Sequence, residues 1–291
     1  MLSDNPGAFA DKFAGIEAAI PYVSTDLDRV VISFEDRNYD FAVQAHDVPI
    51  RNGRLAASAP DLDCEGFALL HWPSRVVAER RDELIRENSQ PREEMALVNA
   101  DYLAELVPLI AELSGAREVF AQYDTITVRF SKRASQRSWM STAGFAHLDF
   151  ERSEIDRLLA ETIALTGREV RPFRRQILYQ TWRVITDPPQ DMPLALCDGR
   201  TVSETDVIPM DFHGPEGSRN EFVRSRACRF NPQHRWYYFP DMRPEEVLVF
   251  KGFDSDVPDA RNAMHTAFDD MSVDSAVPRG SIECRFIALF D

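Results

Sequence analysis

The chain has 291 residues, a formal net charge of −15 at pH 7 and 44% hydrophobic residues. Its length accommodates one large domain or two small ones, and the hydrophobic fraction excludes a wholly disordered chain because it supports a sizeable core. The negative charge disfavours nucleic acid as a partner, because the surface would repel the phosphate backbone.

The N-terminal stretch MLSDNPGAFADKF lacks a basic start followed by an apolar run, and no stretch of the sequence is apolar for long enough to span a bilayer. The cysteines are far apart and lack CxxC spacing; they are Cys64, Cys197, Cys228 and Cys284. We therefore expect reduced, buried thiols in a cytoplasmic protein, with neither a disulfide framework nor a zinc knuckle.

Residues 1–118 mix short strands with helices. RVVISFED, residues 29–36, alternates as a strand does. A helix is predicted from about Ser74 to about Glu87. A second helix is predicted over residues 99–115, with Asn99 as its N-cap and Gly115 after its last turn. Pro108 is expected to kink this second helix.

From Val119 onward, short runs rich in β-branched and aromatic residues alternate with Asp, Pro and Gly turns. The strand candidates are DTITVRF, RQILYQTWRVI, PLALCD, HRWYYFP, EVLVFKGFD, NAMHTAF and SIECRFIALF. Strands at this spacing are typical of a sandwich or barrel. One helix interrupts them over residues 151–167, with Ser153 as the expected N-cap and Gly167 at its end. We therefore predict a single domain over 1–291, with an N-terminal α/β elaboration (1–118) and a β-core (119–291).

An ionisable pair stands in GFAHLDFERSE, residues 144–154. Side chains alternate faces along a strand, so His147 and Asp149 share a face and lie close enough to grip one metal ion. Taken alone, the pair also fits a salt-bridged His–Asp pair at the surface.

A second histidine, His265, shares its strand face with Ala263 and Ala267, which are small and leave room for something bound. Two histidines and one carboxylate form the facial triad of non-haem Fe(II) oxygenases, which keeps positions open for substrate and O2. The same ligands also suit zinc in a hydrolase, where a metal-bound hydroxide is the nucleophile.

Fourteen residues after His265, the stretch PRGSIECRF places Arg279 and Ser281 on one face of a new strand, together with Glu283 and Arg285. An arginine that points into a barrel is costly unless it meets a carboxylate, which its planar fork binds bidentately.

The order HxD, a long insertion, His, and then Arg-x-Ser at the start of the last strand resembles the Fe(II)/2-oxoglutarate-dependent oxygenases. Further stretches are similar to the CmcJ/AsaB-type hydroxylase/desaturase branch of secondary metabolism. They are DLDCEGFALL, TWRVITDPPQDMPLALCDGRTVSETDVI, HRWYYFPDMRPEEVLVFKGFDSD, MHTAFDD and PRGSIECR. Together they cover nearly the whole chain, in order.

The resemblance implies a mainly β fold with a double-stranded β-helix core (jelly roll, cupin-like) and N-terminal helices. Its catalytic residues and Fe(II) ligands would be His147, Asp149 and His265. Arg279 and Ser281 would hold the distal carboxylate of 2-oxoglutarate. Two further residues are candidates for this co-substrate: Gln180, where the branch has Asn two residues before Trp, and Arg285, whose alternative is a rim salt bridge with Glu283.

The implied enzyme is a dioxygenase that uses Fe(II), 2-oxoglutarate and O2 to oxidise a C–H bond of a small-molecule biosynthetic intermediate, with release of succinate and CO2. The outcome would be hydroxylation, desaturation, epoxidation or oxidative cyclisation. Halogenation is disfavoured, because halogenases of this superfamily replace the carboxylate that Asp149 provides with a small residue.

Two alternatives use the same cavity. A zinc-dependent hydrolase has no evident use for a dicarboxylate clamp at Arg279 and Ser281. A non-catalytic jelly-roll binding protein would have to keep three metal ligands in its core without a metal, which is costly.

Candidates for substrate contacts are Arg129, Trp182, Arg183 and Tyr238. Either arginine would bind a substrate carboxylate if it points into the barrel, and is otherwise a solvent-facing strand charge. His234 precedes an aromatic strand and is expected to be a packed or hydrogen-bonded core residue rather than a ligand.

Overall fold

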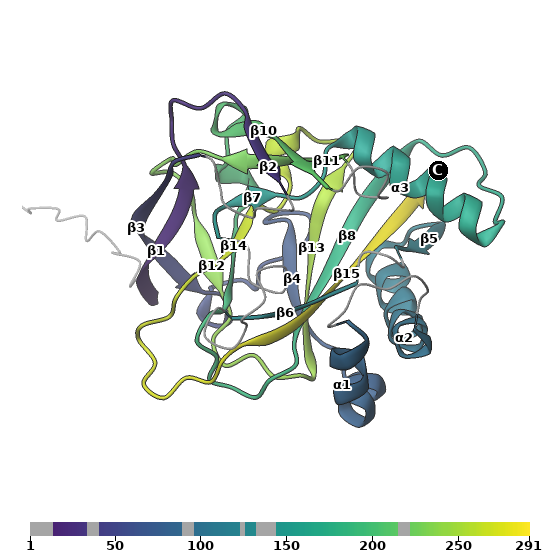
Figure 1. Ribbon diagram of the computed structural model, residues 1–291, viewed down its shortest axis with the longest axis horizontal. Coiled ribbons are helices and arrows are strands. Elements are labelled where there is room, and N and C mark those ends of the chain that lie inside the picture. The colour runs from purple at the N-terminus through teal and green to yellow at the C-terminus, as the bar shows by residue number, and fades with distance from the viewer. Residues whose placement is uncertain (1–13, 34–40, 89–95, 123–125, 132–143, 215–221) are drawn as a thin grey trace, which may run out of the picture.

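The computed structural model describes residues 14–33, 41–88, 96–122, 126–131, 144–214 and 222–291, and these form two packed β-sheets with three α-helices (Figure 1). The six-stranded sheet runs β4-β13-β8-β15-β5, with β6 also paired to β15. Its strands are β4 (Phe67–His71), β5 (Glu118–Ala121), β6 (Thr127–Phe130), β8 (Arg175–Val184), β13 (Glu246–Asp254) and β15 (Gly280–Phe290).

The nine-stranded sheet of the described residues runs β1-β3-β12-β9-β14-β7-β11-β10-β2. Its strands are β1 (Gly15–Val23), β2 (Val30–Ser33), β3 (Val43–Asn52), β7 (His147–Leu148), β9 (Leu194–Cys197), β10 (Val207–His213), β11 (Phe222–Cys228), β12 (Trp236–Tyr238) and β14 (His265–Ala267). Short 3-10 turns lie at Gly53–Leu55, Gly199–Thr201, Glu204–Asp206 and Asp259–Arg261. Strands from both halves of the chain enter both sheets.

The central strands of the six-stranded sheet are buried on both faces, because helices cover one face and the larger sheet covers the other. The outer face packs against α1 (Arg75–Glu87) and α2 (Leu97–Ser114), through residues such as Tyr179 and Phe286. The inner face meets the larger sheet, where Trp182 and Phe250 pack against Leu196. Residues that alternate along β8 and β15 therefore have opposite environments.

A third helix, α3 (Arg152–Thr166), follows β7 and covers the far end of the inner face. Its residues Ile155 and Leu158 pack against Leu178 and Ile287 of the six-stranded sheet. The helix therefore fills one end of the space between the sheets and fixes where the chain leaves β7.

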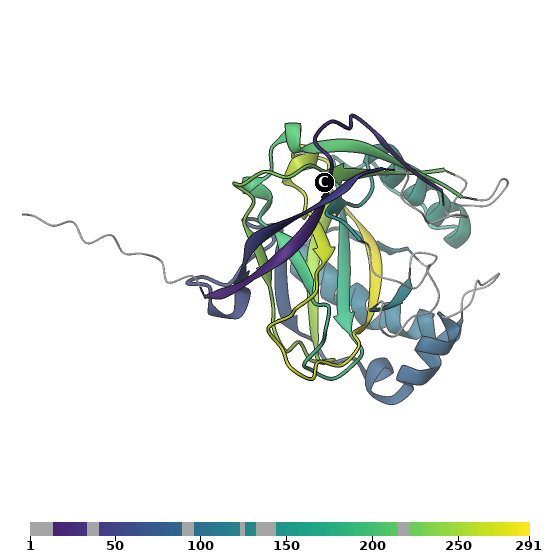
Figure 2. The ribbon, with the colours of Figure 1, turned by 60° about the vertical axis from the view of Figure 1, so that its left-hand side comes forward.

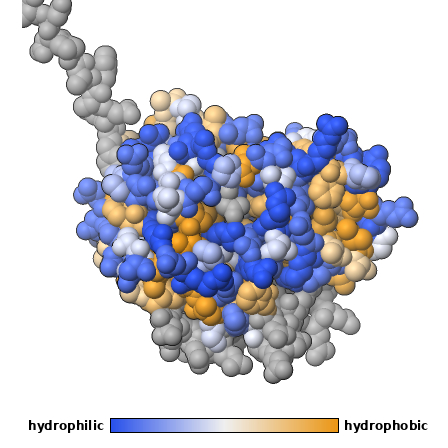
Figure 3. Space-filling view, turned by 90° about the horizontal axis from the view of Figure 1, so that it is seen from above, coloured by the Kyte–Doolittle hydropathy of each residue, from blue (hydrophilic) through white to orange (hydrophobic). Residues whose placement is uncertain are grey.

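Strand β1 crosses the molecule diagonally and pairs with β3 at the edge of the nine-stranded sheet (Figure 2). On the face shown in Figure 3, hydrophilic side chains predominate and hydrophobic ones gather in a few limited areas. In the part of the chain described above, none of the helices has the length and apolar character required to cross a bilayer.

Several local predictions are confirmed, and the two helix N-caps are wrong. Helix α1 starts after Ser74, whose side chain accepts from the Val77 amide. Helices α2 and α3 end at glycines in the left-handed conformation, Gly115 and Gly167, both with φ of 64°.

Helix α2 begins two residues earlier than predicted, with Ala96 as N-cap, and continues through Pro108. Asn99 is instead buried and accepts from Asn88 Nδ2 at 2.8 Å, which ties α2 to the end of α1. Similarly, Glu151 rather than Ser153 is the N-cap of α3. In both cases contacts with other elements outweigh the local capping preference: Asn99 bonds to Asn88, and Glu151 pairs with Arg224 and Arg226 of β11.

The cysteines carry no disulfide, as predicted. Burial is confirmed for Cys197, Cys228 and Cys284, but Cys64 is exposed. It lies in an acidic turn in which Asp61 accepts from its amide, so the sequence DLDCEGF is polar at this position.

Candidate metal centre

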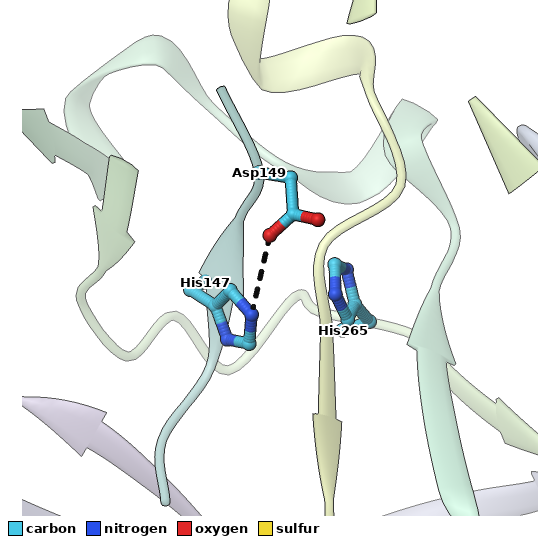
Figure 4. A group of neighbouring side chains, drawn as sticks. All are labelled: His147, Asp149 and His265. Carbon is cyan, nitrogen blue, oxygen red and sulfur yellow. Dashed lines mark ion pairs between the residues drawn. The ribbon is translucent and has the colours of Figure 1, made fainter. Parts of the chain in front are cut away.

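The candidate ligands His147 and Asp149 lie at the middle of the nine-stranded sheet. Strand β7 has only two residues, and His147 is opposite His265 of β14 on one side and Ala227 of β11 on the other. Asp149 follows directly after this strand, and its side chain turns toward His147 (Figure 4). Strand alternation predicted that His147 and Asp149 share one face, and the two side chains do lie together in space.

Both imidazoles are held by backbone carbonyls. The Nδ1 atom of His147 lies 2.9 Å from the Phe145 carbonyl oxygen, and that of His265 lies 3.0 Å from the Ala263 carbonyl oxygen. A carbonyl only accepts, so each Nδ1 carries the proton and each Nε2 keeps a lone pair. Such a hydrogen bond is the usual way in which a metal-binding histidine is oriented.

One ligand atom from each of His147, Asp149 and His265 lies within 4.8 Å of the other two, close enough for all three to share one ion. The two imidazole centroids are 4.4 Å apart, and Nε2 of His147 is 3.6 Å from Oδ1 of Asp149. Figure 4 shows the three side chains converging on one point from β14 and from the end of β7. Their donor set, two imidazoles and one carboxylate, suits Fe(II).

The protonation states of these ligands also suit a metal. Burial, followed by the proximity of His265, lowers the pKa of His147 to about 4, so this imidazole is neutral at pH 7. Burial alone would raise the pKa of Asp149, but the Arg285 guanidinium together with His265 and His147 holds that pKa well below its usual range. A neutral imidazole and an ionised carboxylate are the forms that bind a metal ion.

Arg279 lies in the same cavity and has no carboxylate partner among the described residues. It is 1% exposed, its Nη1 donates to the Met192 carbonyl at 2.9 Å, and its Nε is buried without a hydrogen-bond partner. Its guanidinium stacks over the Trp182 ring, 5.3 Å from the centroid. Burial, with the nearby charge of Arg129, lowers its pKa to about 10, so it remains a cation at pH 7. Such a buried cation fits an anionic ligand.

Arg285, the rival carboxylate clamp, is already paired. Its Nη2 lies 2.8 Å from Oδ2 of Asp149 and 3.2 Å from Oε1 of Glu283. Arg285 is 8% exposed, so the expected rim salt bridge is instead a buried one. The two carboxylates raise the pKa of Arg285 well above its usual value, against the effect of burial.

The remaining predicted residues divide by the face of the sheet on which they lie. Trp182 and Arg129 line the cavity with the three ligands and Arg279. Gln180 and Ser281 are buried on the inner face of the six-stranded sheet. Gln180 is paired with Arg285 across the strands, and Ser281 is paired with Val184. Neither is among the residues that line the cavity.

Two predicted substrate contacts lie away from this cavity. Arg183 faces the helices, where it donates to Tyr102 Oη at 3.0 Å and to the Trp72 carbonyl at 2.8 Å. Tyr238 packs on the other face of the nine-stranded sheet, against Phe268. Strand alternation puts both on the wrong face, and the sequence did not reveal which face was inward.

The prediction for His234 is confirmed, because it is buried in a hydrogen-bonded cluster apart from the cavity. Its Nε2 lies 3.2 Å from Asp206 Oδ2 and its Nδ1 lies 3.0 Å from the Tyr22 hydroxyl. The sequence analysis missed Asp191, whose Oδ1 accepts from the Arg279 backbone amide at 2.8 Å. The sequence offered only one indication of its importance: Asp191 lies in TDPPQDMP, within a stretch that is similar to the hydroxylase/desaturase branch.

The comparisons with known proteins agree with this geometry. Residues 20–289 match the family model described as the oxidoreductase/YMDC permease-like domain. The Fe(II)/2-oxoglutarate-dependent dioxygenase nvfI of Aspergillus novofumigatus is 26% identical, with 82% of each chain covered. The hydroxylase/desaturase asaB of Aspergillus flavus is 27% identical over 63% of this chain and 80% of its own. The predicted resemblance to this branch is thereby confirmed.

A solved structure of the iron and alpha-ketoglutarate-dependent endoperoxidase NvfI superposes with a TM-score of 0.77 at 22% identity, covering 95% of this chain and 98% of that one. This likeness confirms the predicted fold, a mainly β jelly-roll core with added helices.

Proposed function

The chain belongs to the oxidoreductase/YMDC permease-like domain family, and because its relatives include an Fe(II)/2-oxoglutarate-dependent dioxygenase and a hydroxylase/desaturase, we propose that it is itself an Fe(II)/2-oxoglutarate-dependent oxygenase. It oxidises a C–H bond of a small-molecule intermediate and releases succinate and CO2. The observation that carries the proposal is that the three candidate ligands share a cavity with Arg279, a buried cation that has no carboxylate partner among the described residues.

In this proposal His147, Asp149 and His265 hold Fe(II), which with 2-oxoglutarate and O2 supplies the oxidising power. The two Nε2 lone pairs and the ionised carboxylate point to one place, and the carbonyls behind the imidazoles keep them there. Three protein ligands would leave coordination positions open for the co-substrates.

Arg279 receives the distal carboxylate of 2-oxoglutarate, with Ser281 beside it on the inner face. A fixed, desolvated guanidinium binds a carboxylate strongly because water does not compete. The Asp191 carboxylate holds the Arg279 backbone and Trp182 covers its guanidinium, so the cation is positioned before the ligand arrives. Gln180, on the same inner face, remains a candidate for a further contact.

The substrate would enter from a larger neighbouring cavity of about 550 Å³, which Ala267 also lines. Its volume falls in the range of small-molecule sites. Many of its described lining residues are small or apolar, among them Ala18, Ala19 and Met192. Arg129 and Trp182 lie at the inner cavity, where they would contact the reacting end of the substrate. The proposal further includes a cytoplasmic location and, from the net charge of −15, no nucleic-acid partner.

The test is to add Fe(II) and 2-oxoglutarate to the metal-free protein without oxygen. A visible charge-transfer band of the chelate is expected, and a zinc hydrolase or a non-catalytic binding protein gives none. Glutarate, which lacks the keto group, is the matched control and should give no band. Failure to form the band at saturating concentrations would overturn the proposal.

A further inference from the structure

Arg285 holds one oxygen of the candidate metal ligand Asp149 and leaves the other exposed to the histidines. Two nitrogens of its guanidinium, Nη2 and Nε, lie 2.8 Å and 3.3 Å from Oδ2. The second oxygen, Oδ1, is the one that lies 3.6 Å from His147 Nε2. The two oxygens of the carboxylate therefore have different partners.

The guanidinium is itself fixed on several sides. Glu283, two residues earlier on the same face of β15, accepts from Nη2 at 3.2 Å. The Phe150 ring lies beneath it, 5.1 Å from the centroid. Glu283 Oε1 also accepts from Arg129 at 3.4 Å, so charges alternate along a row from Arg129 to Asp149. Arg285 and Asp149 are buried at the cavity, where their pair is weakly screened, whereas Glu283 and Arg129 at the other end of the row are half-buried.

We propose that Arg285 is a positioning residue for the metal centre. By holding Oδ2 it fixes the rotation of the Asp149 carboxylate, so that Oδ1 alone is presented to the ion with the two Nε2 atoms. A carboxylate free to rotate could chelate with both oxygens and occupy a position needed by the co-substrates. This inference rests on the proposed function for the identity of the metal centre.

The same geometry separates the roles of Arg279 and Arg285, two of the arginines that line the cavity. Arg285 has two carboxylate partners within 3.2 Å, whereas Arg279 has none among the described residues. A carboxylate ligand would have to displace Asp149 or Glu283 to bind Arg285, but meets no competitor at Arg279. The structure therefore assigns the co-substrate clamp to Arg279 and the orientation of the metal ligand to Arg285.

The experiment uses Co(II) alone as the probe, added anaerobically to the metal-free protein, and records affinity and the visible d–d spectrum. The variants are Arg285→Gln and Arg285→Lys. Arg129→Gln is the matched control, because it removes an arginine charge that also pairs with Glu283 but does not contact Asp149. Loss of positive charge alone would tighten cation binding in both Gln variants.

We expect Arg285→Gln to bind Co(II) about ten- to a hundred-fold more weakly, the usual cost of losing an outer partner of a metal ligand, with a changed spectrum. Arg285→Lys should recover part of the affinity, because an ammonium keeps the charge but not the two-nitrogen contact. Arg129→Gln should bind as tightly as the wild type or more tightly, with an unchanged spectrum.

The inference would be overturned if Arg285→Gln bound Co(II) with the affinity and spectrum of the wild type. It would also be overturned if the variant needed more 2-oxoglutarate while its Co(II) binding was unaltered, because that result would indicate that Arg285 binds the co-substrate. If Arg285→Gln fails to fold by circular dichroism, Arg285→Lys decides: wild-type Co(II) binding contradicts the role and weakened binding supports it. Absence of Co(II) binding by the wild type would overturn the proposed function itself.

Discussion

His147 and His265 lie directly opposite each other on antiparallel strands β7 and β14, with their ring centroids 4.4 Å apart. This pairing joins residues 118 positions apart in the sequence at one point of the sheet. Each ring is fixed by the backbone carbonyl two residues earlier, just before its strand begins, so the strand pairing and the adjoining backbone together form the site.

Replacement of either histidine by alanine should abolish the anaerobic Fe(II)/2-oxoglutarate band. Each His147→Ala or His265→Ala variant removes one of three ligands, and the remaining two hold the ion only weakly. His71→Ala is the matched control, because His71 is exposed at the end of β4, away from the cavity. A band of normal intensity in either ligand variant would contradict the assignment.

The Arg279→Gln variant should need about ten- to a hundred-fold more 2-oxoglutarate to reach half of the maximal intensity of the anaerobic band. The reason is that a hydrogen bond to a charged group contributes about 1.5–3 kcal/mol. Metal affinity in the absence of 2-oxoglutarate should not fall, because the residue does not contact the ligands and its loss removes a positive charge from the cavity.

The matched control is Arg183→Gln, which alters another fully buried arginine, held by Tyr102 and by backbone carbonyls on the helix side. Its unfolding free energy should fall by about 1–3 kcal/mol through unsatisfied partners. Its half-maximal 2-oxoglutarate concentration should match that of the wild type. An equal rise in both variants would indicate a general loss of structure.

The metal-free protein should lose stability as the pH falls from about 6.5 to about 4. Burial lowers the pKa of folded His147 to about 4, whereas the unfolded chain binds this proton near pH 6.5. Between these values the unfolded state binds more protons, so the free energy of unfolding decreases with falling pH, by at most about 1.4 kcal/mol per pH unit for one histidine.

Burial also lowers the pKa of His234, which adds to the effect in the same direction. Urea unfolding at several pH values measures the slope, and His147→Gln should flatten it. Parallel curves for the wild type and the variant would show that the titrating groups lie elsewhere.

Tyr22→Phe should destabilise the fold without affecting the metal site. The Tyr22 hydroxyl accepts from Trp236 Nε1 at 2.7 Å and lies 3.0 Å from His234 Nδ1, in the core beside β1. Removing it leaves two buried polar atoms without a partner, at about 1–3 kcal/mol each. Thermal unfolding measures the loss, and the anaerobic Fe(II)/2-oxoglutarate band should be retained at full intensity. A variant as stable as the wild type would mean that water replaces the hydroxyl.

The amino-acid sequence by itself determined the elements of this protein and the residue types of its site. Alternation along strands put His147 beside Asp149, and the glycine positions marked the ends of α2 and α3, because these features depend on local backbone geometry. The order of HxD, His and Arg-x-Ser was enough to single out the three candidate ligands, whose ligand atoms lie within 4.8 Å of one another.

Only the tertiary structure decided which face of each strand points into the cavity and which charges pair there. Arg183 and Arg279 are both buried strand arginines, but one meets the helices and the other the candidate metal centre. Arg285 was a candidate for the co-substrate, and its pairing with Asp149, 136 residues away in the sequence, could not be read from the local pattern. The physical reason is that contacts between sheets depend on packing of distant strands, which no local pattern encodes.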